Sequence, residues 1–184
     1  MHEQTDHEQT DIEAIRAEAL RKLGRNIVNF SKIERGFKLL LSVSQISGTT
    51  TTLRENMIAN QRRFHKQTLG QLVGSFNRDV LCSHRETKPP ENLSELWLGL
   101  SFTVNASDPE QWKQTLAALV AERNHLIHHQ LGDLDTTSVE DYRQLTDLLD
   151  EQNPRLLHRL DELRSMLEVL IGATQEIKKL PEWM

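Results

Sequence analysis

Apolar residues recur at helical spacing along the first part of the chain, and this periodicity constrains the fold more than any other feature. From Asp11 to about Ser47 they fall on one helical face, at Ile12, Ile15, Ala19, Leu23, Ile27, Phe30, Ile33, Phe37, Leu40 and Leu41. Such spacing is typical of an amphipathic α-helix, whose apolar stripe must be covered by other elements. The sequence therefore predicts one long helix packed against further helices.

The rest of the 184-residue chain continues this helical pattern. Further helices are predicted from Leu53 to Leu81, from about Ser107 to Leu131, and from about Thr137 onward, where Pro154 indicates a restart or a kink. Ser107 with Glu110, and Thr137 with Glu140, have the spacing of capping boxes. Residues 82–107 are expected to be an irregular insert, a packed loop or a short helix with a strand-like end.

Together these segments predict an all-α fold, an up-and-down bundle of four main long helices with an irregular insert between the second and third helices. Residues 1–10 are expected to be a disordered tail, and residues 11–184 a single helical-bundle domain. The sparse content of 5 prolines and 8 glycines agrees with long helices.

Composition argues against a protein stabilised by internal disulfides and against a protein that spans a membrane. The single cysteine, Cys82, allows no disulfide within the chain. The polar N-terminal segment is unlike a signal peptide, and the apolar runs are shorter than the roughly 20 residues that span a bilayer. We therefore expect a cytoplasmic protein that does not enter a membrane.

Charge is unevenly distributed although the net charge is only -5. Basic side chains gather between residues 16 and 38, and acidic ones between residues 133 and 176. One interpretation is that helix faces of opposite sign pack side by side. The other is that the basic first helix, with the segment "RRFHK" at 62–66, guides RNA toward the protein.

The stretch "LVAERNHLIHHQLGDLD", residues 119–135, carries the candidate site. On a helical wheel of about 100° per residue, Arg123 falls in the middle of the apolar stripe, and Asn124 and His128 flank the stripe. His125 and His129 point away from it. An arginine on an apolar face needs a carboxylate, carbonyl groups or a bound anion as its partner.

Other chemistries fit the same stretch less well. Glu122 and His125 have the Glu-x-x-His spacing of di-iron bundles, but the second copy that such sites need is missing from the sequence. The three histidines are spread on the wheel, and no fourth metal ligand is evident. No glycine-rich phosphate loop is present. We therefore expect no metal and no cofactor.

The combination of a helical bundle with Arg123, Asn124 and His128 on its third long helix resembles the HEPN superfamily. Its ribonuclease members carry an arginine and a histidine separated by four to six residues, usually with a polar residue after the arginine. Gln130 stands where many toxin members have a tyrosine, and His129 also satisfies the spacing, so the choice of His128 rests on the wheel.

The resemblance implies a metal-independent endoribonuclease, a toxin or defence effector that leaves 2',3'-cyclic phosphate ends. It implies RNA as substrate, a cognate antitoxin or regulator, and a homodimer whose two motifs share one cleft. Arg123 and His128 lie about 140° apart on the wheel, which also favours a site composed from two chains. The alternative is a non-catalytic helical dimerisation or partner-binding module with Arg123 in a structural ion pair.

Overall fold

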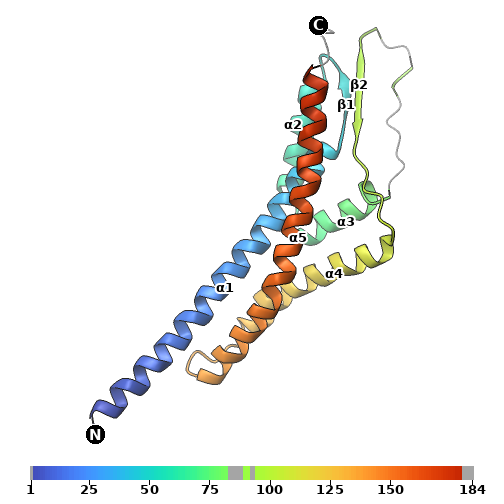
Figure 1. Cartoon of the computed structure of the whole chain (residues 1–184). Helices are drawn as coiled ribbons and strands as arrows, with labels where there is room; N and C mark the ends of the chain where they lie inside the picture. Colours follow the sequence, from blue (N-terminus) through green and yellow to red (C-terminus); the bar gives the residue numbers. More distant parts are fainter. Residues whose placement is uncertain (1, 83–88, 92–93, 180–184) are drawn as a thin grey trace. The chain divides into compact units, whose positions relative to one another are not determined.

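The computed structural model describes the backbone of residues 2–82, 89–91 and 94–179, and the side chains of residues 12–82, 89–91 and 94–173. Its elements are shown in Figure 1: α1 (His2–Ser44), β1 (Gln45–Thr49), α2 (Leu53–His65), α3 (Leu69–Asp79), β2 (Trp97–Ser101), α4 (Pro109–His125), the π-turn η1 (Leu126–Gln130) and α5 (Val139–Lys179). The described chain is mostly helical, as predicted. Among its helices, none has the length and apolar content needed to cross a bilayer.

Three predicted element boundaries were wrong. The second helix is interrupted between His65 and Leu69, where Thr68 begins α3 and its backbone N–H donates to the side chain of Gln71. The insert forms the strand β2 instead of a packed loop or short helix, and its partner β1 replaces the predicted end of the first helix. Pro154 lies inside a continuous α5, so of the two predicted alternatives the restart is wrong and the kink stays a prediction.

The helix starts are also shifted by one residue from the predicted capping boxes. Asp108 caps α4, because its carboxylate accepts the N–H of Gln111 at 2.9 Å. Ser138 caps α5, since its hydroxyl accepts the N–H of Asp141 and donates to the Asp141 carboxylate. The tail expected at residues 1–10 stays a prediction: the backbone of α1 is described from His2, but the side chains before residue 12 lie outside the described part.

The chain divides into two compact units. The first unit contains Met1–Ile33 and Ala121–Leu160, and the second contains Glu34–Val120 and Asp161–Met184. Helices α1, α4 and α5 contribute residues to both. The candidate site lies entirely in the first unit.

The second unit has an aromatic core. The ring of Phe76 packs edge-on against Phe37, with centroids 5.4 Å apart, and is stacked on Trp112 at 6.1 Å. Where α1 passes α5 in this unit, a Cβ on Gly36 would lie 3.2 Å from Leu163 Cδ1, so the absence of a side chain permits the close approach. These contacts bury α1 and α5 residues on the faces that the periodicity predicted.

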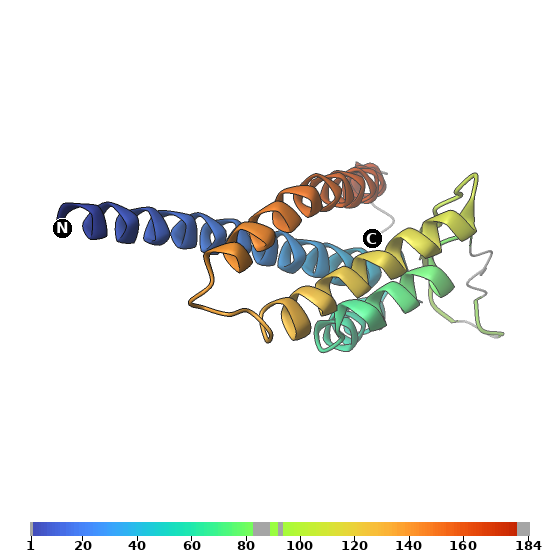
Figure 2. The same ribbon diagram turned by 90° about the horizontal axis from the view of Figure 1, so that it is seen from below.

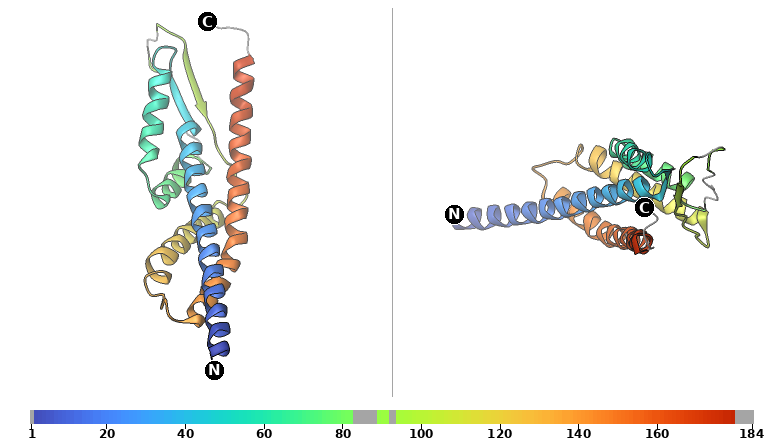
Figure 3. Two further views of the ribbon diagram at one scale, coloured as in Figure 1. Left: turned by 90° about the vertical axis from the view of Figure 1, so that its left-hand side faces the viewer. Right: turned by 90° about the horizontal axis from the view of Figure 1, so that it is seen from above.

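The small sheet of the second unit is antiparallel. Ile46 lies opposite Leu100, and Gly48 opposite Leu98. Helix α2 runs alongside β1 (Figure 3). The sheet joins segments far apart in the sequence, which is why local periodicity did not predict it.

A buried polar seam joins α1 to α5 in the first unit. Asn26 is fully buried, and its side-chain amide donates to the backbone carbonyl of Leu149 at 2.9 Å and to Gln152 Oε1 at 3.1 Å. Pro154 has no N–H to donate to the carbonyl four residues earlier, so the hydrogen-bond ladder of α5 is interrupted in this turn. The seam therefore joins α1 to a turn of α5 in which one carbonyl group, that of Asp150, has no helical N–H donor.

Ion pairs flank this seam on the surface. Asp150 accepts from Lys22 and from Arg25, both on α1. One turn earlier, Arg21 holds Glu18 through two hydrogen bonds of 2.8 and 2.7 Å. The interpretation that oppositely charged helix faces pack side by side is thus confirmed for Lys22 and Arg25.

Replacing Asn26 by alanine is expected to lower the free energy of unfolding by about 2–3 kcal/mol, because the buried acceptors at Leu149 and Gln152 lose their donor. Chemical denaturation monitored by circular dichroism measures this change. Asn105, which is exposed, provides the control: its replacement by alanine should change stability by less than about 0.5 kcal/mol. Equal effects of the two substitutions would contradict a structural role for the seam.

Stability should also fall in acid. Hydrogen bonds from Arg21 lower the pKa of Glu18 from 4.5 to about 2, and Lys22 lowers the pKa of Asp150 below its ordinary value. Because both folded pKa values are depressed, the contribution of these carboxylates is present above their unfolded values and is lost as pH falls through their folded values. For Glu18 this range runs from 4.5 to about 2.

An NMR titration of the Glu18 carboxyl should therefore have its midpoint near 2 in the wild-type protein. In Arg21→Ala the midpoint should move back toward 4.5, because the strongest hydrogen-bond donors are gone. A wild-type midpoint near 4.5 would show that the pair does not persist in solution.

Candidate active site

The three predicted residues lie at the end of α4 and just beyond it. Arg123 and Asn124 occupy the last turn of α4, and His128 lies in η1. The predicted buried stripe is confirmed at Leu116, Leu119 and Leu126. Arg123 is half-buried beside this stripe, whereas Asn124 and His128 are exposed.

Arg123 has a neutral partner. Its Nη1 donates to Asn124 Oδ1 at 3.2 Å. Within the described residues, no carboxylate pairs with Arg123. The guanidinium therefore keeps its positive charge uncompensated and has further N–H groups available to an anion.

The acid next to Arg123 in the sequence is engaged elsewhere. Glu122 accepts from Arg155 at 3.1 Å and from Gln152 at 3.2 Å, both on α5. Because Gln152 also accepts from Asn26, the polar seam continues from α1 through α5 to the last turn of α4. This network fixes the backbone that carries Arg123 and also keeps the nearest carboxylate occupied.

The helix widens immediately after Arg123 and Asn124. The N–H of Leu131 donates to the carbonyl of Leu126, five residues earlier, at 3.2 Å. The chain then turns through residues 131–138 into α5 (Figure 2). A π-turn brings residue i+5 back toward the face of residue i, whereas an α-helix places it about 140° away.

The π-turn determines which side chains lie beside His125. His125 Nε2 lies 3.1 Å from Gln130 Nε2, a contact between residues five apart that an α-helix does not allow. The ring of His129 stacks on that of His125 with centroids 5.4 Å apart. Since the predicted angle between Arg123 and His128 assumed an unbroken α-helix, that angle no longer supports the choice of a two-chain site.

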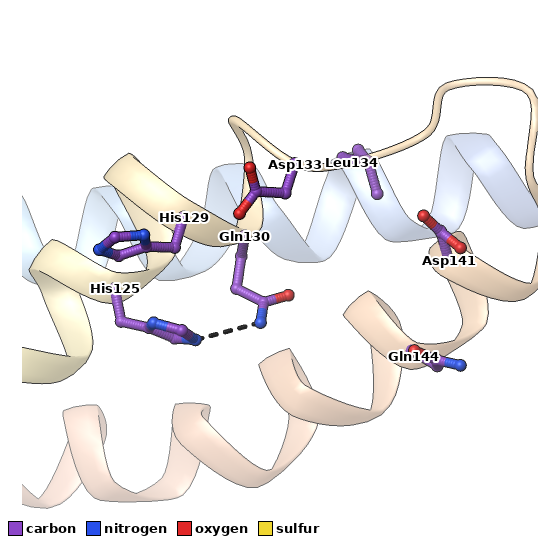
Figure 4. A pocket seen from close by; sticks show the side chains of 7 residues that line it. All are labelled: His125, His129, Gln130, Asp133, Leu134, Asp141 and Gln144. Atoms are coloured by element: carbon purple, nitrogen blue, oxygen red, sulfur yellow. Dashed lines mark hydrogen bonds between the residues drawn. The ribbon is translucent and has the colours of Figure 1, made fainter.

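A small open pocket of about 130 Å³ is built around these side chains (Figure 4). His125, His129 and Gln130 come from the end of the third predicted helix, and Asp133 and Leu134 from the loop. Asp141 and Gln144 come from α5. The sequence analysis missed this grouping, because the π-turn that assembles it has no signature in the residue pattern.

The structure separates the two candidate histidines by their surroundings. His129 lines the pocket that also holds Asp133 and Asp141, whereas His128 lies outside it. Two carboxylates disfavour an anionic phosphate through charge repulsion. A phosphate group would therefore be repelled less near His128 than in the pocket beside His129. No hydrogen bond joins His128 to Arg123 or Asn124 in the described part of the chain.

The exposed basic surface lies on α2. Its C-terminal end, called here the basic end of α2, consists of Arg62, Arg63, His65 and Lys66, which are all exposed. None of these four forms an ion pair with another described residue. Among the described residues, no three His, Cys, Asp or Glu side chains are grouped as a metal ion would require.

Replacing Arg123 by alanine should reduce the free energy of unfolding by less than about 1 kcal/mol, because the side chain is half-exposed and has no carboxylate partner. A structural ion pair in a closed core would instead cost about 3 kcal/mol or more. Thermal or chemical denaturation distinguishes these values. Asn26→Ala, with its larger expected loss, is the control for the sensitivity of the measurement.

Comparison with known proteins adds no relative. No protein family model, no curated protein and no solved structure matches this chain. The resemblance to the HEPN superfamily therefore rests on Arg123, Asn124 and His128 together with the helical fold.

Proposed function

We propose that the protein is a metal-independent endoribonuclease that cleaves RNA to 2',3'-cyclic phosphate and 5'-hydroxyl ends. The observation that carries the proposal is the guanidinium of Arg123, which is half-buried and without a carboxylate partner in the described residues. An uncompensated cation held against an apolar stripe is a suitable binding group for a phosphate. Its neighbours can supply the remaining chemistry.

In this mechanism the ribose 2'-hydroxyl attacks the adjacent phosphorus, and the bond from phosphorus to the 5'-oxygen breaks. His128 accepts the proton of the 2'-hydroxyl or donates one to the leaving 5'-oxygen, because an imidazole ring nitrogen can act as a base or, once protonated, as an acid. Arg123 binds the phosphate and stabilises the negative charge that develops on it. Asn124 orients the guanidinium through its hydrogen bond to Arg123 Nη1.

We further propose a homodimer and a role as a toxin or defence effector. The second acid–base group comes from another copy of the chain, so the active form is a homodimer with the motif of each chain in a shared cleft. The four main helices form an up-and-down bundle in each copy.

The protein acts in the cytoplasm as a toxin or defence effector and is restrained by a cognate antitoxin or regulator.

RNA would approach through the exposed basic end of α2. On α1, Arg21, Lys22 and Arg25 are less suitable, because they are already paired with carboxylates. Free lysines and arginines bind the phosphate backbone without regard to sequence, and this binding weakens with salt.

A non-catalytic dimerisation or partner-binding module is the second candidate. The strand β2 favours it, because the outer edge of this strand has no hydrogen-bond partner in the described chain. The two candidates differ in whether the purified protein turns over RNA.

The test is cleavage of a varied RNA panel by the purified full chain in EDTA, beside Arg123→Ala, His128→Ala and His129→Ala. Loss of the general acid or base typically costs about 10²–10⁴-fold in rate. We expect losses of this order in the first two variants, near-normal rates in His129→Ala, and 2',3'-cyclic phosphate at the new ends. A 2'-deoxy substitution at the cleaved nucleotide should block the reaction.

Two results would contradict the proposal. One is the absence of cleavage across the panel by a protein that is folded. The other is cleavage that persists unchanged in Arg123→Ala, which would identify a contaminating nuclease. Loss of activity in His129→Ala but not in His128→Ala would retain the nuclease and transfer the role of the histidine to the pocket.

A further inference from the structure

We propose that a second copy of this chain pairs with the outer edge of β2, antiparallel and centred on Gly99, to extend the two-stranded sheet to four strands. The pairing is inferred from the strand alone and does not require RNA cleavage.

The outer edge of β1 is closed by α2. Asn60 donates its side-chain amide to the carbonyl of Gln45 at 2.9 Å, and Asn56 donates to the carbonyl of Ser47 at 2.8 Å. The N–H of Thr49 donates to the hydroxyl of Thr52 at 3.0 Å. Every second residue of β1 therefore has an outward-facing backbone group that already has a partner, and the sheet cannot grow on this side.

Among the described residues, none pairs with the outer edge of β2. Hydrogen bonds from Thr50 N–H to the Leu96 carbonyl and from Phe102 N–H to the Ser44 carbonyl flank the ladder. Since the backbone groups of successive residues alternate between the two edges of a strand, Trp97, Gly99 and Ser101 face outward. In the described chain these outward N–H and C=O groups have no hydrogen-bond partner.

The open edge is complementary to itself. In an antiparallel pairing centred on Gly99, Gly99 lies opposite Gly99 of the partner subunit, and Trp97 lies opposite Ser101 of the partner subunit. All of these are outward-facing positions, so each pair exchanges both of its N–H···O bonds. A two-fold axis through Gly99 satisfies the whole edge of both copies.

The same register joins two apolar surfaces. Leu96, Leu98 and Leu100 lie on one face of β2, the face on which Ile46 of β1 is buried. Leu96 and Leu98 are 50% and 43% exposed. In the proposed pairing Leu98 lies opposite Leu100 of the partner subunit, so the apolar faces of the two copies become continuous and these leucine side chains contact each other.

Charge does not oppose this association. The segment from Leu96 to Ala106 contains no charged residue and no proline. Natural proteins usually protect an exposed edge strand with such residues, because a bare edge pairs with other strands. Two identical uncharged edges can meet without repulsion or burial of a charge, which favours a second copy as the occupant.

The pairing can be tested by cross-linking the full chain at the proposed two-fold axis. The Cα atoms of directly opposed, hydrogen-bonded residues lie about 5.5 Å apart, within the range for a disulfide. In a Cys82→Ser background, Gly99→Cys should therefore form a covalent dimer on mild oxidation. Ser101→Cys is the matched control, since the two Ser101 positions would be about 13 Å apart.

A second pair of variants tests the free association by sedimentation. Gly99→Pro removes only an outward N–H and keeps the ladder between β1 and β2, so it should give a folded monomer. Leu98→Lys should also abolish the dimer by placing a charge in the apolar contact. Leu157→Lys changes a leucine of similar exposure, 46%, on α5 and should leave the dimer intact.

The outcomes separate this inference from the nuclease proposal. A monomeric wild-type chain, equal cross-linking at positions 99 and 101, or a dimer that persists in folded Gly99→Pro would overturn the β2 interface. Binding of the edge by a different protein while the chain alone remains monomeric would also overturn it. Cleavage of RNA by the wild-type chain is measured separately, so the failure of one proposal does not conceal the other.

Discussion

The buried amide of Asn26 is the interaction on which the first unit depends. It binds the Leu149 carbonyl in the turn of α5 that Pro154 interrupts, and it binds Gln152, whose own amide holds Glu122 on α4. A fully buried amide is stabilising only when its hydrogen bonds are made, so it selects one relative position of the three segments. The last turn of α4, which carries Arg123, is thereby held in place. The same network occupies Glu122 and leaves Arg123 without a carboxylate partner in the described residues.

Helix formation and the buried faces were predictable from the sequence, because both depend on local spacing. Leu116, Leu119 and Leu126 are buried as the wheel predicted, and Arg123 lies beside them, half-buried. Elements that depend on long-range pairing were not predictable in the same way. β1 and β2 lie about fifty residues apart in the sequence, and neither segment alone has a pattern that identifies its partner. The break before Thr68 was missed because no glycine or proline marks it between Phe64 and Thr68.

The candidate site was predictable only in part, for a physical reason. Residue types and α-helical geometry placed Arg123 on the inner face and His125 with His129 on the outer face. The π-turn changes the rotation between Leu126 and Gln130, and it creates the contact between His125 and Gln130. That contact depends on backbone geometry that the residue types do not specify. The grouping with Asp133 and Asp141 depends in turn on the loop that follows, so the pocket could be described only from the structure.

In the proposed function Arg123, which has no carboxylate partner among the described residues, binds a phosphate of RNA. The most direct measurement is the NMR signal of its side-chain Nε–H during titration with a 2'-deoxy oligonucleotide, which binds but cannot be cleaved. Arg155, whose Nε donates to Glu122 at 3.1 Å, is the internal reference. If Arg123 binds the phosphate, its signal should show a saturable shift that is weaker at high salt, while the Arg155 signal stays in place. An Arg123 signal that does not move, or that moves only as much as that of Arg155, would contradict the account.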